Sequence, residues 1–421
     1  MKRSEQIIDR IGGLDLWMTV AATAIATLLI IATTQAHAQT FTVLHTFSGS
    51  DGAYPFGTLT MDRDGNLYGT TYNGGSGCNG IGCGTVFKLT HKNSGWILTP
   101  LYNFQGGDDG EFPTGGVTIG PDGDLYGTTN VGGGGPCAPP TGGLGCGTVF
   151  KLEPPATACH AALCPWTEYV LYRFLGGSDG AYPGYGNLAV DAAGNLYGTT
   201  EGDEDKNAAT VFEVGNTRDG WIKIFLYNFG AAAFVGSGVI FDTAGNLYGT
   251  TADGGSGWGS VYEVTFTNEG PMLSTLYTFH DNGDGFDPLG GVAFDQQGNL
   301  YGTTFNDGGR VYQLKPSNGS WTYSSLHHFG GYEGFFNGPA LDASGNVYGA
   351  LYIPSTVFEL TRSNGWLETQ LTDFPEGSDG GEPVGGVTLD ASGNVYGTTS
   401  LGGNDGCSGF DGCGVIFEIT P

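Results

Sequence analysis

One phrase recurs seven times along the chain, and this repetition constrains the fold more than any other feature. Its fullest form is D-x-x-G-N-L-Y-G-T-T, and its tyrosines recur at steps of 47 to 71 residues. Repeats of this length are typical of solenoids and propellers, in which one small unit packs against its neighbours. The repeats leave no room for a second domain. The repeat tyrosines are Tyr68, Tyr126, Tyr197, Tyr248, Tyr301, Tyr348 and Tyr396.

Each repeat unit predicts four short strands. In the last unit the first strand covers residues 386–390, and the second is the word N-V-Y-G-T-T. The third is a word such as T-V-F-K-L at residues 85–89, and the fourth ends in a word such as L-Y-N-F at residues 101–104. β-Branched and aromatic residues dominate all four, as is typical of strands. In the D-x-x-G-N turn, the Asp accepts hydrogen bonds from turn amides and the Gly adopts a positive φ.

The two ends of the repeat region complement each other. Residues 41–47 form a spare fourth strand, and residues 415–420 form a third strand that lacks a fourth. Pairing them closes a ring and removes two exposed strand edges, which a linear solenoid has no need to do. The sequence therefore predicts an all-β, seven-bladed β-propeller with four-stranded blades, closed by pairing of the N-terminal strand with the C-terminal blade. The repeat tyrosines are expected in its core.

Composition supports short strands and excludes some partners. Gly accounts for 79 of the 421 residues, and each Gly costs a helix about 1 kcal/mol relative to Ala, so long helices are excluded. The formal net charge is −28, from 42 acidic and 14 basic side chains. Such a chain repels the phosphates of nucleic acids, which are therefore not expected as partners. The charge suits cations or a salty or acidic medium, or it serves solubility alone.

The first 38 residues have the pattern of an export signal. A basic start precedes an uncharged run at residues 16–32, and an A-H-A triplet ends at Ala38. This pattern predicts a signal peptide at residues 1–38 and a propeller domain at residues 39–421. The alternative is that the segment is kept as an N-terminal anchor. No later segment is apolar enough to cross a membrane, so the mature protein is expected in the periplasm or outside the cell.

Eight cysteines form four close pairs, which agrees with export. The even number and the local pairing predict four small disulfide loops in an oxidising compartment. Zinc is the alternative, but spacings of five to nine residues are wide for paired thiolates, and only one pair has an adjacent His. The pairs are Cys78/Cys83, Cys137/Cys146, Cys159/Cys164 and Cys407/Cys413.

The strand order also assigns each loop to a face of the ring. The loops after the second and fourth strands lie on one face, opposite the D-x-x-G-N turns. An acidic-glycine loop follows the fourth strand in most units, in words such as G-G-S-D-G-A-Y-P. The alternative to a function is ordinary turn chemistry, since Asp-Gly next to Pro is common in turns. We predict a cation site in these loops, with Ca²⁺ as the candidate cofactor, at Asp51, Asp108, Asp179, Asp284 and Asp379.

Residues that break the sevenfold repeat are the candidates for catalysis, because equal blades mostly provide scaffold. Two units lack the loop Asp: one reads G-A-A-A-F-V-G-S-G at residues 230–238, and another has Glu333 instead. His280 lies beside Asp281 and Asp284 and is the best single candidate for an acid–base or metal site. No G-x-S-x-G, H-E-x-x-H or phosphate-loop motif occurs. The histidines that lie in fourth-strand words are expected to pack at the rim, and these are His45, His327 and His328.

The repeat words together resemble a known family. D-x-x-G-N-L-Y-G-T-T, then G-T-V-F-[EK]-L, then L-Y-x-F-x-G-G-x-D-G-x-x-P are similar to the GloVer tandem repeat of exported bacterial proteins of the choice-of-anchor type. The resemblance covers all seven units and implies export and a propeller-like repeat fold, but no particular reaction. It also implies a C-terminal sorting anchor in many members. The chain ends at Pro421 without a hydrophobic tail, so a released or periplasmic protein is expected instead.

Two classes of function remain. The first is a non-catalytic, extracytoplasmic binding or scaffold module that acts through the acidic-glycine loops, with a cation, a ligand or a protein as partner. The second is a propeller enzyme, a lyase or hydrolase of a glycan or lactone, with its site at the mouth of the central channel; this rests on fold-level analogy. We favour the first, because nearly the same loop recurs around the ring. A monomer is expected in either case.

Overall fold

The computed structural model describes residues 39–421 with gaps. The gaps are residues 81, 94, 138–144, 156–165, 185, 203–206, 231–232, 254–256, 281–282, 331–333, 335–336, 375–376, 378, 404–405 and 408–411. The predicted signal peptide, Cys159, Cys164, Asp281 and Glu333 lie outside the described residues. The chain divides into Met1–Thr40 with Pro421 and a second unit, Phe41–Thr420, which is described below. In the described part of the chain we find no helix long and apolar enough to span a bilayer.

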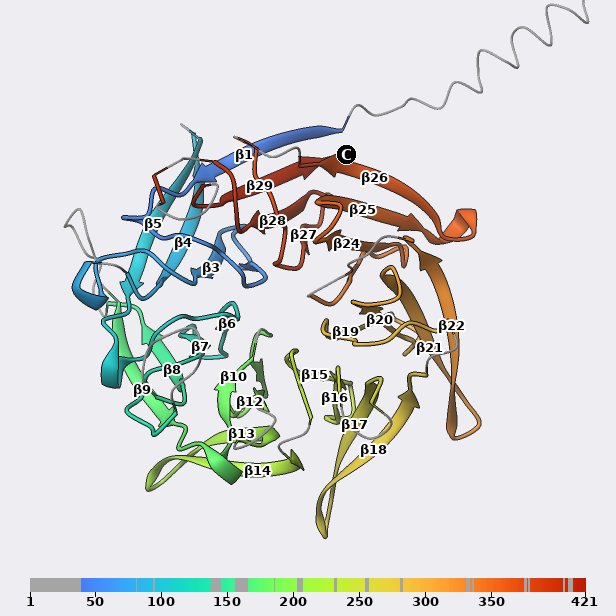
Figure 1. Cartoon of the computed structure of the whole chain (residues 1–421), viewed down its shortest axis with the longest axis horizontal. Helices are drawn as coiled ribbons and strands as arrows, with labels where there is room; N and C mark the ends of the chain where they lie inside the picture. The colour runs from blue at the N-terminus through green and yellow to red at the C-terminus, as the bar shows by residue number, and fades with distance from the viewer. Residues whose placement is uncertain are drawn as a thin grey trace, which may run out of the picture. The chain divides into compact units, whose positions relative to one another are not determined.

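The unit Phe41–Thr420 is a seven-bladed β-propeller, as the repeats predict (Figure 1). Each blade is an antiparallel sheet, with its first strand near the axis and its fourth strand outside. Blade 1 contains β2 (Thr60–Met61), β3 (Leu67–Thr71), β4 (Thr85–Lys92) and β5 (Gly95–Asn103). Blade 2 contains β6 (Thr118–Ile119), β7 (Leu125–Thr129), β8 (Thr148–Glu153) and β9 (Thr167–Arg173). Blade 3 contains β11 (Ala189–Val190), β12 (Leu196–Glu201), β13 (Ala209–Thr217), β14 (Gly220–Gly230) and an extra strand, β10 (Ala181–Pro183), that pairs with β12.

The remaining four blades follow the same order. Blade 4 contains β15 (Ile240–Phe241), β16 (Leu247–Thr251), β17 (Ser260–Thr267) and β18 (Gly270–Thr278). Blade 5 contains β19 (Val292–Phe294), β20 (Leu300–Thr304), β21 (Arg310–Ser317) and β22 (Ser320–His328). Blade 6 contains β23 (Ala340–Leu341), β24 (Val347–Leu351), β25 (Thr356–Thr361) and β26 (Leu367–Asp373). Blade 7 contains β27 (Thr388–Leu389), β28 (Val395–Thr399), β29 (Val415–Thr420) and β1 (Thr40–Thr46).

The ring closes as predicted, by pairing of the first strand with the last. β1 lies beside β29 as the outer strand of blade 7 (Figure 1). The ring of Phe41 packs against Phe417 of β29 and Phe374 of the preceding blade, with centroids 5.8 and 5.7 Å apart. The amide of Phe47 donates to the carbonyl of Gly414 at 3.1 Å. Both ends of the repeat region are therefore fixed in one sheet, and β29 has a strand partner on each side.

The D-x-x-G-N word forms the predicted turn. In blade 1, Asp62 Oδ1 accepts from the amides of Asp64 and Asn66, each at 2.9 Å. Its Oδ2 accepts from Asn66 Nδ2 at 2.7 Å and from the Tyr68 hydroxyl at 3.1 Å. Gly65 has a φ of 79°, which favours glycine. Burial alone would raise the pKa of Asp62, but these hydrogen bonds together lower it.

The inner strands form the core because neighbouring blades cover both of their faces. All five residues of β3 are buried, and the same holds for β7, β16, β20 and β28. Six of the seven repeat tyrosines are buried as predicted, while Tyr348 is half-buried. The Gly of the YGTT word makes room for the aromatic residue of the third strand. A Cβ on Gly69 would lie only 2.6 Å from the ring of Phe87.

In blades 1, 3, 4 and 5 the first threonine of the YGTT word joins neighbouring blades. Thr70 Oγ1 donates to the carbonyl of Gly115 in the next blade at 2.7 Å, and Thr250 Oγ1 donates to Gly290 in the same way at 2.9 Å. These hydroxyls are buried and paired, so they have a structural role that needs no catalytic explanation.

Candidate functional site

The loops after the second and fourth strands lie together on one face, as predicted. The loop that leaves the outer strand of one blade crosses to the next blade and pairs there with the loop after the second strand. Isolated bridges record this pairing four times around the ring: Ala53↔Asn73, Glu111↔Val131, Phe286↔Asn306 and Gly381↔Leu401. The acidic-glycine loops and the cysteine pairs Cys78/Cys83, Cys137/Cys146 and Cys407/Cys413 are therefore neighbours on the same face.

The acidic-glycine loops after β1, β9 and β18 are each closed by their own aspartate. Asp179 accepts from the amide of Leu175 at 2.8 Å and from the Tyr172 hydroxyl at 2.9 Å. Asp284 accepts from the amide of His280 at 3.1 Å and from the Tyr277 hydroxyl at 2.5 Å. The same arrangement connects Asp51 with the amide of Ser48 and His45 Nε2, both at 2.9 Å. The Asp thus ends the outer strand and orients the aromatic residue that precedes it.

In blade 1 this role belongs to Asp109, the neighbour of Asp108, whose predicted part in a cation site is a separate matter. Asp109 accepts from the amide of Gln105 and from the Tyr102 hydroxyl, at 2.5 and 2.8 Å. Asp108 is exposed, and its backbone carbonyl accepts from Arg173. The sequence reads Asp-Asp at this point, so the repeat alone did not indicate which of the two closes the loop. Asp379, the fifth predicted residue, is also exposed.

The five predicted aspartates lie in five separate loops. Among the described residues, the one group of three metal-type side chains within 4.8 Å of one another is Cys78, Cys83 and Glu111. Cys78 and Cys83 are joined as a disulfide, and Glu111 Oε1 accepts from the amide of Gly107 at 2.9 Å. That group therefore has a structural explanation, and the cation site in the acidic-glycine loops stays a prediction.

Three of the four predicted disulfides are formed. They are Cys78–Cys83, Cys137–Cys146 and Cys407–Cys413, while Cys159 and Cys164 lie outside the described residues. The second cysteine of each formed pair presents its carbonyl to a residue that has a positive φ and precedes a proline. Tyr54, for example, has a φ of 58° and donates its amide to the carbonyl of Cys413 at 2.9 Å. The disulfides thus brace loops whose backbone is itself strained.

The histidines singled out by the sequence have local partners. His280 Nδ1 lies 3.7 Å from Asp284 Oδ2, and its ring is exposed on the loop face. His327 Nε2 lies 3.0 Å from Glu368, and His328 Nε2 lies 2.9 Å from the carbonyl of Asp307. None of these pairs lines the central cavity.

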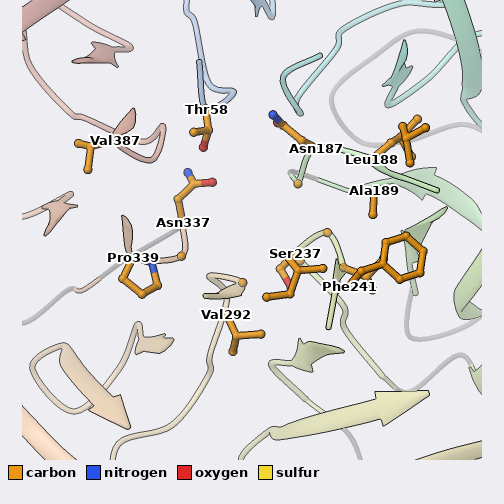
Figure 2. A pocket seen from close by; sticks show the side chains of 18 residues that line it. Thr58, Asn187, Leu188, Ala189, Ser237, Phe241, Val292, Asn337, Pro339 and Val387 are labelled. Carbon is orange, nitrogen blue, oxygen red and sulfur yellow. The ribbon is translucent and has the colours of Figure 1, made fainter. Parts of the chain in front are cut away.

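A cavity of about 450 Å³ lies on the propeller axis (Figure 2). It is lined by the segments that lead into the first strands, mainly from blades 3 to 6. Its polar side chains are Thr58, Asn187, Ser237 and Asn337, and Phe241 and several aliphatic residues form its apolar wall (Figure 2). The lining contains no Asp, Glu, His, Cys, Lys or Arg among the described residues. The cavity can therefore make hydrogen bonds and apolar contacts, but this lining holds no side chain able to act as an acid, base or ionic partner.

The polar side chains of the cavity also connect blades. Asn187 Oδ1 accepts from the amide of Gly116 at 2.9 Å, and its Nδ2 donates to Thr60 Oγ1 at 3.2 Å. Thr58 Oγ1 accepts from the amide of Gly386 at 3.1 Å, which joins blades 7 and 1. Asn337 Nδ2 donates to the carbonyl of Val384. Part of the hydrogen-bonding capacity of the cavity is therefore used to hold the ring together.

Sequence reasoning missed a recurrent contact between blades. In blades 2, 3 and 5 the residue three positions before the outer-strand L-Y-x-F-like word contacts the acidic-glycine loop of the preceding blade. In blade 2 this residue is Glu168, whose carboxyl shares a hydrogen bond with Asp109. In blade 3 it is Lys223, whose Nζ lies 3.1 Å from Asp179 Oδ1. Aligning the repeat words with one another places these residues at equivalent positions, but no single word indicates the contact.

Glu168 and Lys223 both have shifted pKa values at these contacts. Burial, followed by the negative charge of Asp109, raises the pKa of Glu168 to about 8. Burial lowers the pKa of Lys223 to about 8, against the opposing effect of Asp179. Glu201 in β12 is a third case, because burial raises its pKa to about 8 and its Oε1 has no hydrogen-bond partner among the described residues.

Comparison with known proteins identifies the repeat. A family model described as the Gloeobacter/Verrucomicrobia repeat matches residues 30–255 and 235–421. The chain belongs to this family. The match confirms the resemblance seen in the repeat words, whereas a choice-of-anchor assignment stays a prediction. No curated protein matches the chain.

Several solved structures are similar to this repeat protein at low sequence identity. A putative 6-phosphogluconolactonase from Bacteroides fragilis NCTC 9343 is 14% identical, with a TM-score of 0.50 over 80% of this chain and 87% of that one. A second, from Bacteroides uniformis ATCC 8492, is also 14% identical, with a TM-score of 0.48 over 74% and 83%. A putative oxidoreductase (glucose dehydrogenase) from Thermus thermophilus is 12% identical, with a TM-score of 0.45 over 90% and 99%. At 14% identity, the likeness to the Bacteroides fragilis structure concerns the fold alone.

Proposed function

We propose that this repeat protein is an exported, non-catalytic binding or scaffold module whose central cavity accepts a small uncharged ligand. The observation that carries the proposal is the absence of any ionisable side chain from the described lining of that cavity. The aspartates of the loop face support it too, since Asp51, Asp109, Asp179 and Asp284 are each engaged in closing their own loops. The three disulfides fit an extracytoplasmic location.

The composition of the cavity indicates the class of ligand. Hydroxyl and amide groups at Thr58, Asn187, Ser237 and Asn337 alternate with an apolar wall that includes Phe241 (Figure 2). A charged ligand would lose its hydration there without gaining an ionic partner, which is costly. A small neutral molecule with hydroxyl or carbonyl groups fits better.

Calorimetry with a panel of neutral monosaccharides and sugar lactones tests this proposal. A matched variant is Val292→Trp, which adds bulk at a buried position of the cavity wall on β19 and leaves the loop face unchanged. We expect heat of binding for at least one probe and about a tenfold or greater loss of affinity in V292W. Binding that survives V292W would move the ligand site elsewhere. A melting temperature within a few degrees of the wild type would show that V292W is folded.

The enzyme alternative is examined with the same probes. Hydrolysis or elimination of a sugar lactone or glycan by the purified protein, abolished by His280→Ala, would overturn the non-catalytic proposal. Unchanged substrate in the presence of protein would agree with it. His280 is chosen because it is the one histidine that the sequence placed beside two acidic residues.

The cation-dependent version of the proposal places Ca²⁺ at the acidic-glycine loops. It is supported by the net charge of −28 and by the exposure of Asp108 and Asp379. Calorimetry with Ca²⁺, and melting with and without a chelator, test it. Neither heat nor a change in melting temperature would reject the ion and leave the loops with their hydrogen-bonded structural role alone.

A further inference from the structure

The outer strand of blade 3 differs from every other outer strand. β14 has 11 residues, whereas the other six have 7 to 9. It pairs with β13 on one side and is the last strand of its sheet, so its other edge has no strand partner among the described residues. An edge of this kind presents unpaired N–H and C=O groups that can accept another strand.

β14 is also unusually apolar on its exposed surface. Ile222, Ile224, Phe225 and Tyr227 are 45%, 41%, 47% and 39% exposed, and they make up four of the eleven exposed large hydrophobic residues of the described chain. A cluster of this kind on a soluble protein marks an interaction site more often than scattered single residues do.

The register between strands allows five of the six other outer strands, β5, β9, β18, β22 and β26, to be compared with β14 position by position. Ile224 pairs with a charged or polar residue of the third strand. At the equivalent position these five strands have Thr99, Tyr169, Ser274, Ser324 and Thr369. At the position of Phe225 they have Pro100, Val170, Thr275, Ser325 and Gln370. Polar residues and proline are the usual means of blocking edge pairing. β9 comes nearest to β14, but it has Thr167 at the position of Ile222, so only β14 of these strands is apolar at all three positions.

The extra length of β14 coincides with the absence of an Asp from the loop that follows it. In blade 2, Asp179 ends β9 by accepting from the amide of Leu175, and it holds Tyr172 by its hydroxyl. The loop after β14 has no Asp, and there the strand continues to Gly230, which pairs with Ala209. Tyr227, the counterpart of Tyr172, is exposed, with Phe229 as its aromatic neighbour at 4.8 Å.

The one charged residue of β14 does not protect its edge. Lys223 turns inward, where its side chain is 1% exposed and lies beside Asp179. Its Nζ lies 4.1 Å from the centroid of Phe225 and 5.0 Å from that of Phe174. The lysine therefore offers no repulsion to a strand that approaches from outside.

We propose that β14 pairs antiparallel with β14 of a second copy of this chain, and that this contact forms a homodimer. The segment W-I-K-I-F at residues 221–225 is symmetric in residue type about Lys223, so a twofold axis at Lys223 places Ile222 opposite Ile224 of the other copy and Trp221 opposite Phe225. Ile222 and Ile224 share one face of the strand, so four isoleucines would meet across the axis. The segment lies before the β-bulge between Phe225 and Tyr227, where pairing is regular.

A second copy fits this edge better than an unrelated partner of opposite charge. The chain has a net charge of −28, so a partner chosen by charge would be cationic, yet the exposed side chains of β14 carry no acid to attract it. The residue pattern is its own complement, as an isologous interface requires. A dimer of this kind differs from the monomer expected from the sequence. Because repulsion between two anionic copies opposes it, dimerisation should strengthen as salt screens the charge.

Sedimentation equilibrium of the protein purified after export tests the proposal. At concentrations of about 1 to 100 µM we expect a monomer–dimer equilibrium that shifts toward dimer between about 50 mM and about 500 mM NaCl. Ile224→Lys should weaken dimerisation at least about 30-fold, as loss of a central contact does. Met272→Lys is the matched control, because Met272 is 56% exposed at the position of Ile222 but lies on β18; it should leave the equilibrium unchanged.

A second variant tests whether loss of the dimer in I224K reflects unfolding rather than a broken contact. Phe225→Pro copies the proline that β5 carries at the equivalent position, so the blade should tolerate it, while the new edge cannot pair. Retained dimer in both I224K and F225P would overturn the proposal, and so would a monomer at the highest protein concentration in high salt. A dimer lost equally in I224K and M272K would also overturn it, because the contact would then not be specific to β14.

Discussion

The boundary between blades 1 and 2 and the boundary between blades 2 and 3 use the same strand position with side chains of opposite charge. Glu168 pairs with Leu152 in the register of blade 2, and Lys223 pairs with the equivalent Val214 in blade 3. Each faces the Asp that closes the preceding acidic-glycine loop. Lys223 makes an ion pair with Asp179, whereas Glu168 and Asp109 are two acids that share a hydrogen bond.

This difference shows that the repeat determines which strand positions lie next to each other. The residue type in each blade determines the charge at that position. The loop Asp is needed at each boundary to end the outer strand, so it is present whatever the next blade places against it. A lysine satisfies that carboxylate directly. A glutamate can do so only by keeping its proton, and its pKa is accordingly raised to about 8. The two boundaries should therefore respond differently to substitution and to pH.

Removal of the lysine is expected to have the largest effect. Lys223→Met keeps the length of the side chain but leaves Asp179 without its cation in a site where the lysine is almost fully buried. We expect the free energy of unfolding to fall by about 3 kcal/mol, as is typical when one partner of a buried ion pair is removed. Chemical denaturation at neutral pH measures it.

The control for this prediction is Lys88→Met. Lys88 lies 4.0 Å from Asp62 at a more exposed site, and its loss should cost less than about 1 kcal/mol. Equal losses in K223M and K88M would show that burial of the Lys223–Asp179 pair makes no difference to stability.

The role of the loop Asp can be compared in neighbouring blades through its tyrosine. Tyr172→Phe removes the hydroxyl that donates to Asp179 at 2.9 Å, so we expect a loss of about 1.5 kcal/mol, typical of a hydrogen bond to a charged group. Tyr227→Phe in blade 3 removes an exposed hydroxyl where the loop has no Asp and should change stability by less than about 0.5 kcal/mol. Thermal unfolding of the two variants side by side measures the difference. A similar cost for both would mean that the Asp does not hold the tyrosine.

Much of the fold was predictable from the sequence because the repeat words contain local information. D-x-x-G-N specifies its own turn, and the lone strands at residues 41–47 and 415–420 specify closure of the ring. The contacts of Glu168 and Lys223 were not predictable in this way. Their partners lie in the preceding blade, and the residue type at that position changes from blade to blade, so only the observed register brings them together.

The candidate site was less predictable than the fold for a related reason. The cavity is lined largely by glycines and small residues from several blades, which form no motif in any one repeat. The acidic-glycine loops do form a motif, but the structure shows that their aspartates accept hydrogen bonds within the same loop. A recurrent acidic word was thus compatible with both a ligand site and a turn, and sequence alone did not separate the two.

Substitution of Glu168 is expected to have the smallest effect on stability. It nevertheless separates the two boundaries best, because its effect depends on pH. Glu168 has a folded pKa of about 8 against an ordinary value of 4.5, so the folded state holds a proton that the unfolded state has released. Its stabilising contribution is therefore complete below about pH 4.5 and is lost as the pH rises toward 8 and beyond. Glu201 acts in the same direction. Lys223 acts in the opposite direction and at higher pH, because its folded pKa of about 8 lies below 10.5, so its contribution favours folding increasingly between those values.

Glu168→Gln keeps the shape of the side chain and removes its titration. Because Glu168 is partly open to solvent, screening limits the effect, and we expect a gain in stability of no more than about 1 kcal/mol at about pH 8.5 and little change at about pH 5. Denaturation midpoints of wild type and E168Q across this pH range measure this, with Glu153→Gln, an exposed acid on the preceding strand, as control. Parallel pH profiles for wild type and E168Q would contradict a proton held between Glu168 and Asp109. If the stability of E168Q depends less on pH than that of the wild type, while E153Q behaves as the wild type does, the pH dependence arises at the boundary between blades 1 and 2.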